Sequence, residues 1–263
     1  MSQILAPRAA ATVLTVRDAP NGYEILMVRR NVRSEFMGGV YVFPGGALDE
    51  RDLHAPVLGL DDLSASARLE VDGGGLAYYV ACLRELFEEA GLLVACGPEG
   101  QHRSFASEGD AARLHAHRTS LNADETSLAE VLVAEGVVAD LRDIAYFAHW
   151  ITPVGPPRRY DTRFFVALAP DGQVASHDDS ETTDLRWLRP RDALAARERG
   201  EIDMVVPTVR SLEAVASLER AHEVLEFAHS IARVPVVRPR AVQRDEGVVI
   251  LLPGEDGYDD PTP

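Results

Sequence analysis

Lysine is absent from the sequence, so all 26 cations are arginines. This absence excludes a catalytic Schiff-base lysine and a P-loop, whose motif places Lys beside Ser or Thr. Acidic residues number 42 and give a formal net charge of −16. Nucleic acids and anionic membranes need a basic protein surface, so we expect neither as a partner. Arginine as the only fixed cation suits bidentate binding of phosphate or carboxylate, although genomic base composition also explains a missing lysine.

Cysteine is scarce as well, and long apolar runs are missing. Cys82 and Cys96 are the only two cysteines, too few for a disulfide framework, which favours a reducing compartment. No apolar run approaches the roughly 18 residues of a membrane span. The first 16 residues lack the charged-then-apolar layout of a secretion signal. We therefore expect a cytoplasmic protein.

Apolar periodicity predicts a chain that mixes hairpins with helices. Short β-branched and apolar segments predict strands at residues 9–16, 23–29, 40–43, 92–95, 144–151, 162–168 and 185–188. Three- and four-residue spacing predicts helices at residues 76–90, within 104–139, at 191–199 and at 209–231. Residues 49–75 are polar and irregular, and Pro44-Gly45-Gly46 ends the third strand. The mixture predicts an α/β (α+β) fold, most simply a layered α/β/α sandwich with a mixed sheet.

The helix predicted over residues 76–90 carries an unusual group of acids near its C-terminal end. Glu85, Glu88 and Glu89 stand at i, i+3 and i+4 and share one face. They repel one another and lie where the helix dipole disfavours negative charge. A hard divalent cation bound by these oxygens, Mg²⁺ or Mn²⁺, relieves both penalties; a solvated acidic face is the alternative. Arg84, four residues before Glu88, can form an ion pair with it.

The segment from Arg84 to Leu92 resembles part of the sequence box of the Nudix hydrolase superfamily. That box reads G-x5-E-x7-R-E-U-x-E-E-x-G-U, with U a bulky aliphatic residue, and this segment matches every specified position of its second half. The first half departs from the pattern. If Gly46 is the opening glycine, Asp52 stands where Glu is expected, and Arg84 follows 38 residues after the glycine instead of 14. The box is therefore interrupted by an insertion at about residues 53–75.

An interrupted box of this kind looks like the coenzyme A diphosphatase-like branch of the superfamily. The residues 26–30, Gly39 and the residues 43–46 resemble the coenzyme A signature that precedes the box in some members. The match is partial, because Glu35 stands where a second arginine is expected and Arg33 lies two residues earlier. The resemblance therefore favours the reaction more strongly than it favours the substrate.

The resemblance implies hydrolysis of a diphosphate bond in a nucleoside diphosphate linked to another group, with coenzyme A or acyl-coenzyme A as the leading substrate. Nucleotide sugars, dinucleotides or NADH are the alternative substrates. A non-catalytic Nudix-fold binding or regulatory module is a different class, favoured only by Asp52. The implied partner is thus a small nucleotide-type diphosphate, and a homodimer is considered because many Nudix proteins are dimers.

The same resemblance assigns roles to individual residues. It implies that Glu85, Glu88 and Glu89 bind Mg²⁺ or Mn²⁺ with help from the backbone of Gly45. It also implies that Arg84 orients a box glutamate. The general base is left open between a box glutamate, here Glu85, and a glutamate in a later loop. The candidates for the latter are acids of the segment 177–181, above all Glu181.

Arginines outside the box are the candidates for binding the substrate. Strand alternation places Arg159 and Arg163 on one side of the strand that begins near residue 160. Guanidinium forks suit phosphate, although ion pairing with Asp161 is the plainer interpretation. Arg30 is a further candidate for contacting an anionic substrate.

The chain is interpreted as a single Nudix hydrolase domain over residues 1–235, followed by an extended acidic C-terminal tail at 236–263. Insertions are expected at about 53–75 and 104–140. The second insertion suits a lid, a dimer arm or a solvated segment without function, and the sequence does not separate these alternatives.

Overall fold

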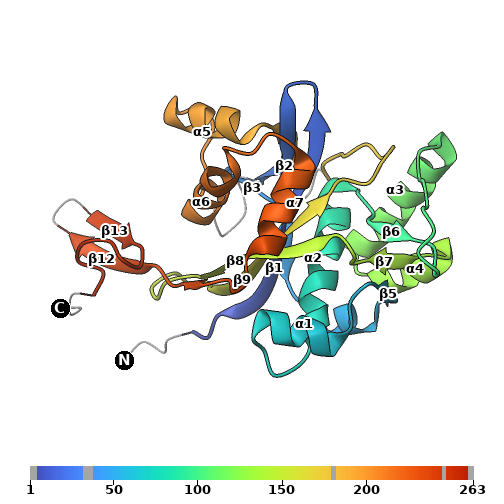
Figure 1. Cartoon of the computed structure of the whole chain (residues 1–263), viewed down its shortest axis with the longest axis horizontal. Helices are drawn as coiled ribbons and strands as arrows, with labels where there is room; N and C mark the ends of the chain where they lie inside the picture. The colour runs from blue at the N-terminus through green and yellow to red at the C-terminus, as the bar shows by residue number, and fades with distance from the viewer. Residues whose placement is uncertain (1–4, 32–37, 179–181, 245–246, 260–263) are drawn as a thin grey trace.

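A mixed β-sheet forms the centre of the protein (Figure 1). The computed structural model describes residues 5–31, 38–178, 182–244 and 247–259. In this part of the chain the sheet has eight strands in the order β10-β2-β1-β9-β8-β11, with β3 added to β2 and β4 to β1. They are β1 (Arg8–Ala19), β2 (Gly22–Arg30), β3 (Tyr41–Val42), β4 (Gly45–Ala47), β8 (Ile144–Ile151), β9 (Tyr160–Leu168), β10 (Thr182–Leu188) and β11 (Val236–Val237).

Strand β1 connects the two halves of this sheet. It forms a hairpin with β2 through the turn at Pro20 and Asn21, after which Gly22 takes a φ of +120° that favours glycine. On its other side β1 pairs in parallel with β9, from Arg8 opposite Tyr160 onward. The predicted strands at residues 9–16, 23–29, 144–151 and 162–168 are therefore confirmed, each extended or matched at its ends.

Helices cover both faces of the sheet (Figure 1). Alternation along β9 divides the core, since Phe165 and Ala167 pack on the side of α2 while Phe164 and Val166 pack on the side of α7. This arrangement confirms the predicted α/β/α sandwich. The first side holds α1 (Asp62–Leu69), α2 (Gly75–Ala90), α3 (Glu108–Asn122) and α4 (Leu128–Glu135), and the second side holds α5 (Pro190–Glu198), α6 (Val206–Val215) and α7 (Ala221–Ser230).

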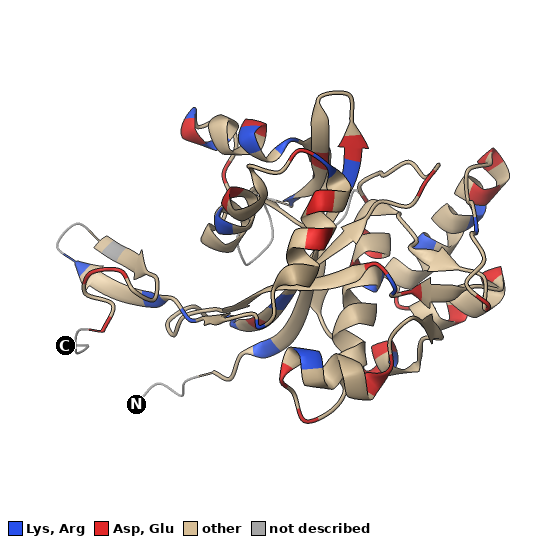
Figure 2. Cartoon of the chain, viewed as in Figure 1, with Lys and Arg blue, Asp and Glu red and all other residues tan. Residues whose placement is uncertain are grey.

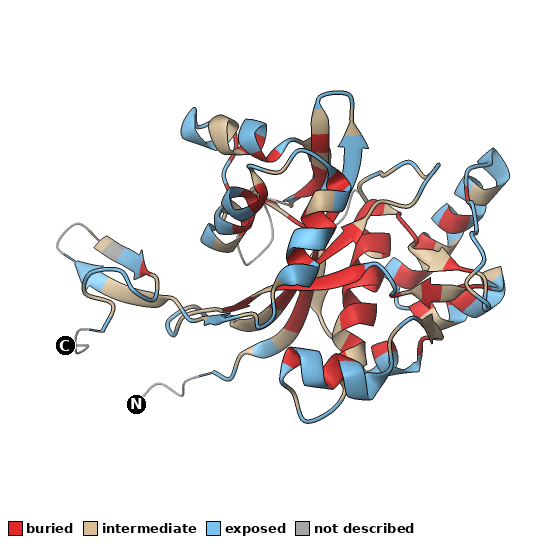
Figure 3. Ribbon diagram, in the orientation of Figure 1, coloured by how far each residue is buried: buried red, intermediate tan, exposed pale blue. Residues whose placement is uncertain are grey.

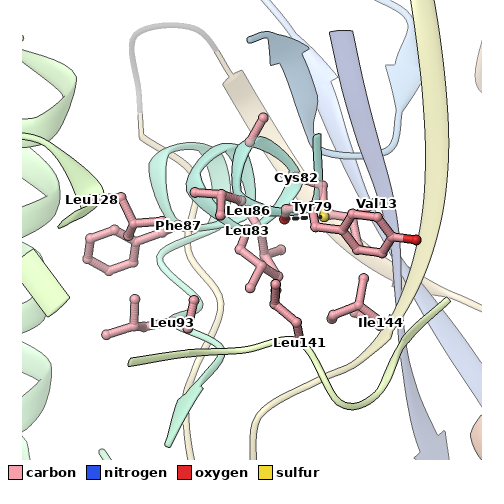
Figure 4. Close-up of a cluster of buried hydrophobic side chains, with 14 of the residues drawn as sticks. Val13, Tyr79, Cys82, Leu83, Leu86, Phe87, Leu93, Leu128, Leu141 and Ile144 are labelled. Atoms are coloured by element: carbon pink, nitrogen blue, oxygen red, sulfur yellow. Dashed lines mark hydrogen bonds between the residues drawn. The ribbon is translucent and has the colours of Figure 1, made fainter. Parts of the chain in front are cut away.

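Helix α2 is fixed mainly by its apolar side chains. Tyr79, Leu83, Leu86 and Phe87 lie in the larger buried cluster with Val13 of β1 (Figure 4). Burial of one such side chain contributes about 1.5–3 kcal/mol. Buried residues concentrate along this helix and the central strands (Figure 3). The apolar face of α2 thus determines where the polar face at its C-terminal end must lie.

The prediction for residues 49–75 was wrong because the structure of this segment depends on tertiary contacts and not only on short-range sequence patterns. Residues 49–75 are not irregular: they form the 3₁₀ helix η1 (Glu50–His54), the strand β5 (Val57–Leu58) and α1. Asp61 stabilises the start of α1 by accepting a hydrogen bond from Ser64 N at 2.8 Å. The third strand does end before Pro44, as predicted, and Gly45 and Gly46 belong to a new strand, β4, which pairs with β1.

Two further segments differ from their predictions for similar reasons. The helix predicted over residues 209–231 is divided into α6 and α7, which both pack on the second face of the sheet. The strand predicted at residues 92–95 is reduced to β6 (Ala95–Cys96), which forms a small sheet with β5 and β7 (Val138–Asp140). Leu92 and Leu93 instead fill the larger core.

The last part of the chain leaves the body of the protein (Figure 1). The segment predicted as a tail begins with β11, which pairs in parallel with β8. It continues into a two-stranded hairpin of β12 (Arg240–Arg244) and β13 (Gly247–Leu251). Among the described helices, none combines the length and hydropathy that a membrane crossing requires.

Candidate active site

The acids of α2 surround one buried arginine. Arg84 Nη1 donates to Glu85 Oε1 and to Glu88 Oε2, each at 2.8 Å. Its Nε donates to Asp52 Oδ1 at 2.8 Å, and its Nη2 donates to the carbonyl oxygen of Ala47 at 2.8 Å. The predicted pairing of Arg84 with Glu88 is confirmed. One guanidinium thus holds three carboxylates and a strand carbonyl in fixed positions, a group called here the Arg84 cluster.

Asp52 belongs to this cluster although its type departs from the Nudix pattern. It lies in η1, where its carboxylate also accepts a hydrogen bond from Asp49 N at 2.8 Å. Its side chain is only 1% exposed, and the contact with Arg84 spans 32 positions of sequence. The shorter side chain therefore still supplies the arginine with a buried carboxylate partner.

Two glycines of β4 bring backbone up to the acids. Gly45 N donates to Glu89 Oε2 at 3.2 Å. A Cβ atom on Gly46 would lie 2.4 Å from Glu85 Oε1, so only glycine leaves room for this carboxylate. Strand β4 and helix α2 therefore meet at the carboxylates of Glu85 and Glu89. The glycines of the Pro-Gly-Gly sequence allow the backbone of β4 to approach these carboxylates closely.

Replacing Gly46 by Ala is expected to lower catalytic activity about 10–100-fold, since the added methyl group displaces Glu85 by roughly an ångström. The variant should fold, because the obstructing atoms belong to a side chain. Steady-state rates and thermal unfolding measure the two effects. Gly73→Ala is the matched control, as a Cβ there meets nothing within 4 Å. Wild-type rates for Gly46→Ala would contradict a role for Glu85 at this position.

The charges of the cluster shift the ionisation of its members. Burial raises the pKa of Glu88 to about 8, with Arg84 opposing the rise and Glu85 adding to it. Burial alone would lower the pKa of Arg84, but Glu85, Asp52 and Glu88 outweigh it and raise that pKa. Arg84 stays charged. It contacts three carboxylates, and one guanidinium carries a single positive charge, which cannot neutralise all of them. Additional positive charge at this position would be stabilising.

The chemistry of these side chains fits a hard divalent cation. Carboxylate oxygens are the donors preferred by Mg²⁺ and Mn²⁺. In the part of the chain that the structure describes, no three His, Cys, Asp or Glu side chains are arranged to hold a metal ion. Arg84 contacts Oε1 of Glu85 and Oε2 of Glu88. Because each carboxylate has two oxygens, a cation can use one while Arg84 keeps the other.

The remaining predicted residues lie in different surroundings. Glu181 falls outside the described residues. Arg30 ends β2 opposite Thr182 of β10, and Thr182 Oγ1 lies 3.5 Å from the carbonyl oxygen of Glu89. The sheet register therefore places Arg30 beside the acidic end of α2.

Arg159 and Arg163 make contacts that do not include the Arg84 cluster. Arg159 donates to the carbonyl oxygens of Thr152 and Pro153, each at 3.1 Å, and to that of Leu5 at 2.6 Å. Arg163 is 5% exposed. It donates to Asp161 at 3.0 Å and lies over the ring of Tyr78 at 4.3 Å. The predicted ion pair with Asp161 is thus present at Arg163.

Sequence reasoning missed the residues that close the C-terminal end of α2. Arg118 of α3, Ser176 and Thr182 contact the carbonyls of Glu88, Ala90 and Glu89 respectively, from positions 30–93 residues further along the chain. No short-range pattern marks them, because each lies in a segment whose own periodicity is weak.

Most other charged residues are distributed over the outer helices and loops (Figure 2).

Comparisons with known proteins agree with this geometry. The family model described as the NUDT19 Nudix domain matches residues 63–215. A Gallus gallus protein named acyl-coenzyme A diphosphatase NUDT19 is 27% identical over 95% of this chain and 79% of its own length. The Homo sapiens protein of the same name is 25% identical over 90% of this chain and 72% of its own length.

A solved structure supports the same grouping. The NUDIX hydrolase from Alicyclobacillus acidocaldarius superposes with a TM-score of 0.66 and is 29% identical. The match covers 85% of this chain and 97% of that one. The similarity therefore extends over both faces of the sheet and beyond the segment that contains the acids.

Proposed function

The chain belongs to the family of the NUDT19 Nudix domain and is a Nudix hydrolase, and on this premise we propose that it cleaves the diphosphate bond of coenzyme A or acyl-coenzyme A. The observation that carries the proposal is the Arg84 cluster, which presents Glu85 and Glu88 together beside the close approach of β4. Relatives named acyl-coenzyme A diphosphatase, aligned over at least nine-tenths of the chain, support the substrate.

The reaction adds water across a phosphoanhydride. The new P–OH bond forms on one phosphorus while the bridging oxygen leaves with the other phosphate, so both products carry a phosphate group. A divalent cation, when bound, neutralises phosphate charge and lowers the pKa of a water ligand. Mg²⁺ and Mn²⁺ are the proposed ions, with Glu85, Glu88, Glu89 and the backbone of Gly45 as the proposed binding groups.

The protein's own residues supply orientation and proton transfer. Arg84 holds Glu85 and Glu88 in one arrangement, which limits the reorganisation needed when the substrate binds. Glu85, or alternatively Glu181, is the proposed group that takes a proton from the attacking water. All three glutamates of the second half of the box are present, which argues against a binding module without catalysis.

Substrate binding by arginine stays a prediction. The position of Arg30 beside the end of α2 supports contact with a phosphate. Arg159 and Arg163 would have to exchange their present carbonyl, carboxylate and ring contacts for the substrate. A homodimer and a cytoplasmic location likewise stay predictions.

The substrate proposal predicts the products of one assay. With Mg²⁺ or Mn²⁺ the protein should split coenzyme A into 4′-phosphopantetheine and 3′,5′-adenosine bisphosphate, resolved by chromatography. We expect kcat/KM for coenzyme A or an acyl-coenzyme A to exceed that for NADH, a dinucleotide and a nucleotide sugar by about tenfold or more, a difference of about 1.4 kcal/mol in transition-state binding. Chelation of the metal should stop the reaction. Faster cleavage of any of the other three would overturn the coenzyme A assignment.

A further inference from the structure

The C-terminal end of α2 is closed by groups from three separate segments. A helix leaves its last four carbonyl oxygens without partners inside the helix. Here three of the four accept a hydrogen bond, and Gly91 takes the left-handed conformation that ends the helix, with a φ of +71°. The donors are Gly91 N to Phe87 O at 2.9 Å, Arg118 Nε to Glu88 O at 2.8 Å and Ser176 N to Ala90 O at 3.0 Å, while Thr182 Oγ1 lies 3.5 Å from Glu89 O.

Arg118 is the charged member of this set. It lies on α3, in the insertion at residues 104–140, and is only 4% exposed. Its guanidinium sits at the negative end of the α2 dipole, where a cation is favourable. Asn122, one turn further along α3, adds a second donor to the Glu88 carbonyl at 3.3 Å. The backbone of Glu88 is therefore tied to α3 by two side chains.

The same guanidinium also holds the segment that leads into β10. Arg118 Nη1 donates to Ser176 Oγ at 3.1 Å and to the carbonyl oxygen of His177 at 3.4 Å. The next residue is Asp178, whose Oδ1 accepts from Thr182 N at 2.8 Å and from Thr182 Oγ1 at 2.7 Å. Thr182 in turn contacts the Glu89 carbonyl. Together with the bond from Ser176 N to the Ala90 carbonyl, this contact holds the segment to the end of α2 at two points.

Arg118 thus joins three elements at one point: the backbone of Glu88, the segment from Ser176 to Asp178 and the insertion helix α3. We propose that Arg118 is a positioning residue for the hydrolase, which sets the backbone of Glu88 so that the carboxylates of α2 converge on a divalent cation. The inference rests on the proposed function, and it gives the insertion at 104–140 a role as the scaffold of this arginine. Displacement of a reacting group by about 1 Å can cost about 100-fold in rate.

The test compares Arg118→Met with Arg113→Met. Arg113 lies on the same helix and makes ion pairs with Asp110 and Glu135, so its variant also removes an arginine and its contacts from α3 but leaves α2 untouched. Binding of Mn²⁺ is followed by electron paramagnetic resonance, which reports free ion without any turnover. For Arg118→Met we expect about tenfold weaker Mn²⁺ binding and a kcat lowered about 10–100-fold, with KM for coenzyme A changed less than about threefold.

The control and the conservative variant complete the design. Arg113→Met should match wild type in Mn²⁺ binding and kcat, and Arg118→Lys, which keeps the charge but not the fork, should lie between wild type and Arg118→Met. Equal Mn²⁺ binding and kcat in folded wild type and Arg118→Met would overturn the proposal, whatever the melting temperature. If Arg118→Met does not fold, Asn122→Ala and Arg118→Lys decide by the same readouts. If the wild-type protein binds Mn²⁺ but does not cleave coenzyme A, the substrate proposal is wrong. The comparison of Mn²⁺ binding between wild type and Arg118→Met still tests the role of Arg118 in that case.

Discussion

Replacing Glu88 by Gln is expected to lower kcat for diphosphate hydrolysis by about 100- to 1000-fold while the protein stays folded. A bound divalent cation supplies several kcal/mol of charge stabilisation in a reaction of this type, Glu88 is one of its proposed ligands, and each 1.4 kcal/mol is tenfold in rate. Gln keeps the shape of the side chain and can still accept a hydrogen bond from Arg84 Nη1 through its amide oxygen. Steady-state kinetics with Mn²⁺ and circular dichroism measure the two outcomes.

The same variant has a stability signature in metal-free protein. Burial raises the folded-state pKa of Glu88 from 4.5 to about 8, so the native state binds more protons than the unfolded state between these values. Stability therefore falls as pH rises from about 4.5 to 8. Glu88→Gln lacks this contribution. When metal is chelated, the melting temperature of the variant minus that of wild type should therefore increase as the pH rises through that window.

A matched control for Glu88→Gln is Glu226→Gln on α7. Glu226 is exposed and pairs at the surface with His222, so its amide should change neither kcat nor the pH dependence of unfolding measurably. The interpretation of Glu88 would be wrong if Glu88→Gln retained more than about a third of the wild-type kcat. It would also be wrong if both variants unfolded with the same pH dependence.

The local sequence was sufficient to predict the helix that carries Glu85, Glu88 and Glu89, but not all of the residues that surround these acids. The apolar spacing of residues 76–90 and the closing Gly91 lie within one element, so they predicted α2 to within one residue. The strands at residues 144–151 and 162–168 were likewise predicted from their own apolar residues, and they correspond to β8 and β9. The pairing of Arg84 with Glu88 is also local, since the two residues stand one helical turn apart.

Contacts across long stretches of sequence were not predictable in this way. Asp52 was identified as a departure from the Nudix pattern, but its partnership with Arg84 depends on how η1 and α1 fold back onto α2. Arg118 sits on a helix with little amphipathic signal, and its position at the end of α2 is decided by the packing of α3 against α2. Residues 179–181, which contain Glu181, lie outside the described part of the structure.

Replacing Arg84 by Met is expected to have the largest effect on stability of any single change in the cluster. It leaves the carboxylates of Asp52, Glu85 and Glu88 without the guanidinium that all three contact. Removing one partner of a buried ion pair costs about 3–5 kcal/mol, because the remaining charge stays buried and uncompensated. Denaturant unfolding in the presence of chelator measures this loss, and kcat should fall to background.

The matched control is Arg51→Met, which likewise removes an arginine that pairs with more than one acid. Arg51 pairs with Asp49 and Asp124 at the surface and is 46% exposed, so its loss should cost less than about 1 kcal/mol. Equal destabilisation by the two substitutions would show that the Arg84 cluster is not what organises this end of α2.

A second substitution separates the stabilising role of Arg84 from its role in the reaction. Asp52→Asn in the Arg84→Met background removes one uncompensated charge from a side chain that is 1% exposed. Part of the lost stability should therefore return, as a coupling between the two sites in a double-mutant cycle. The rate should not return, because the amide at position 52 does nothing to hold Glu85 and Glu88 together. Recovery of the rate along with stability would mean that Arg84 serves the fold alone, whereas recovery of stability without rate assigns it both functions.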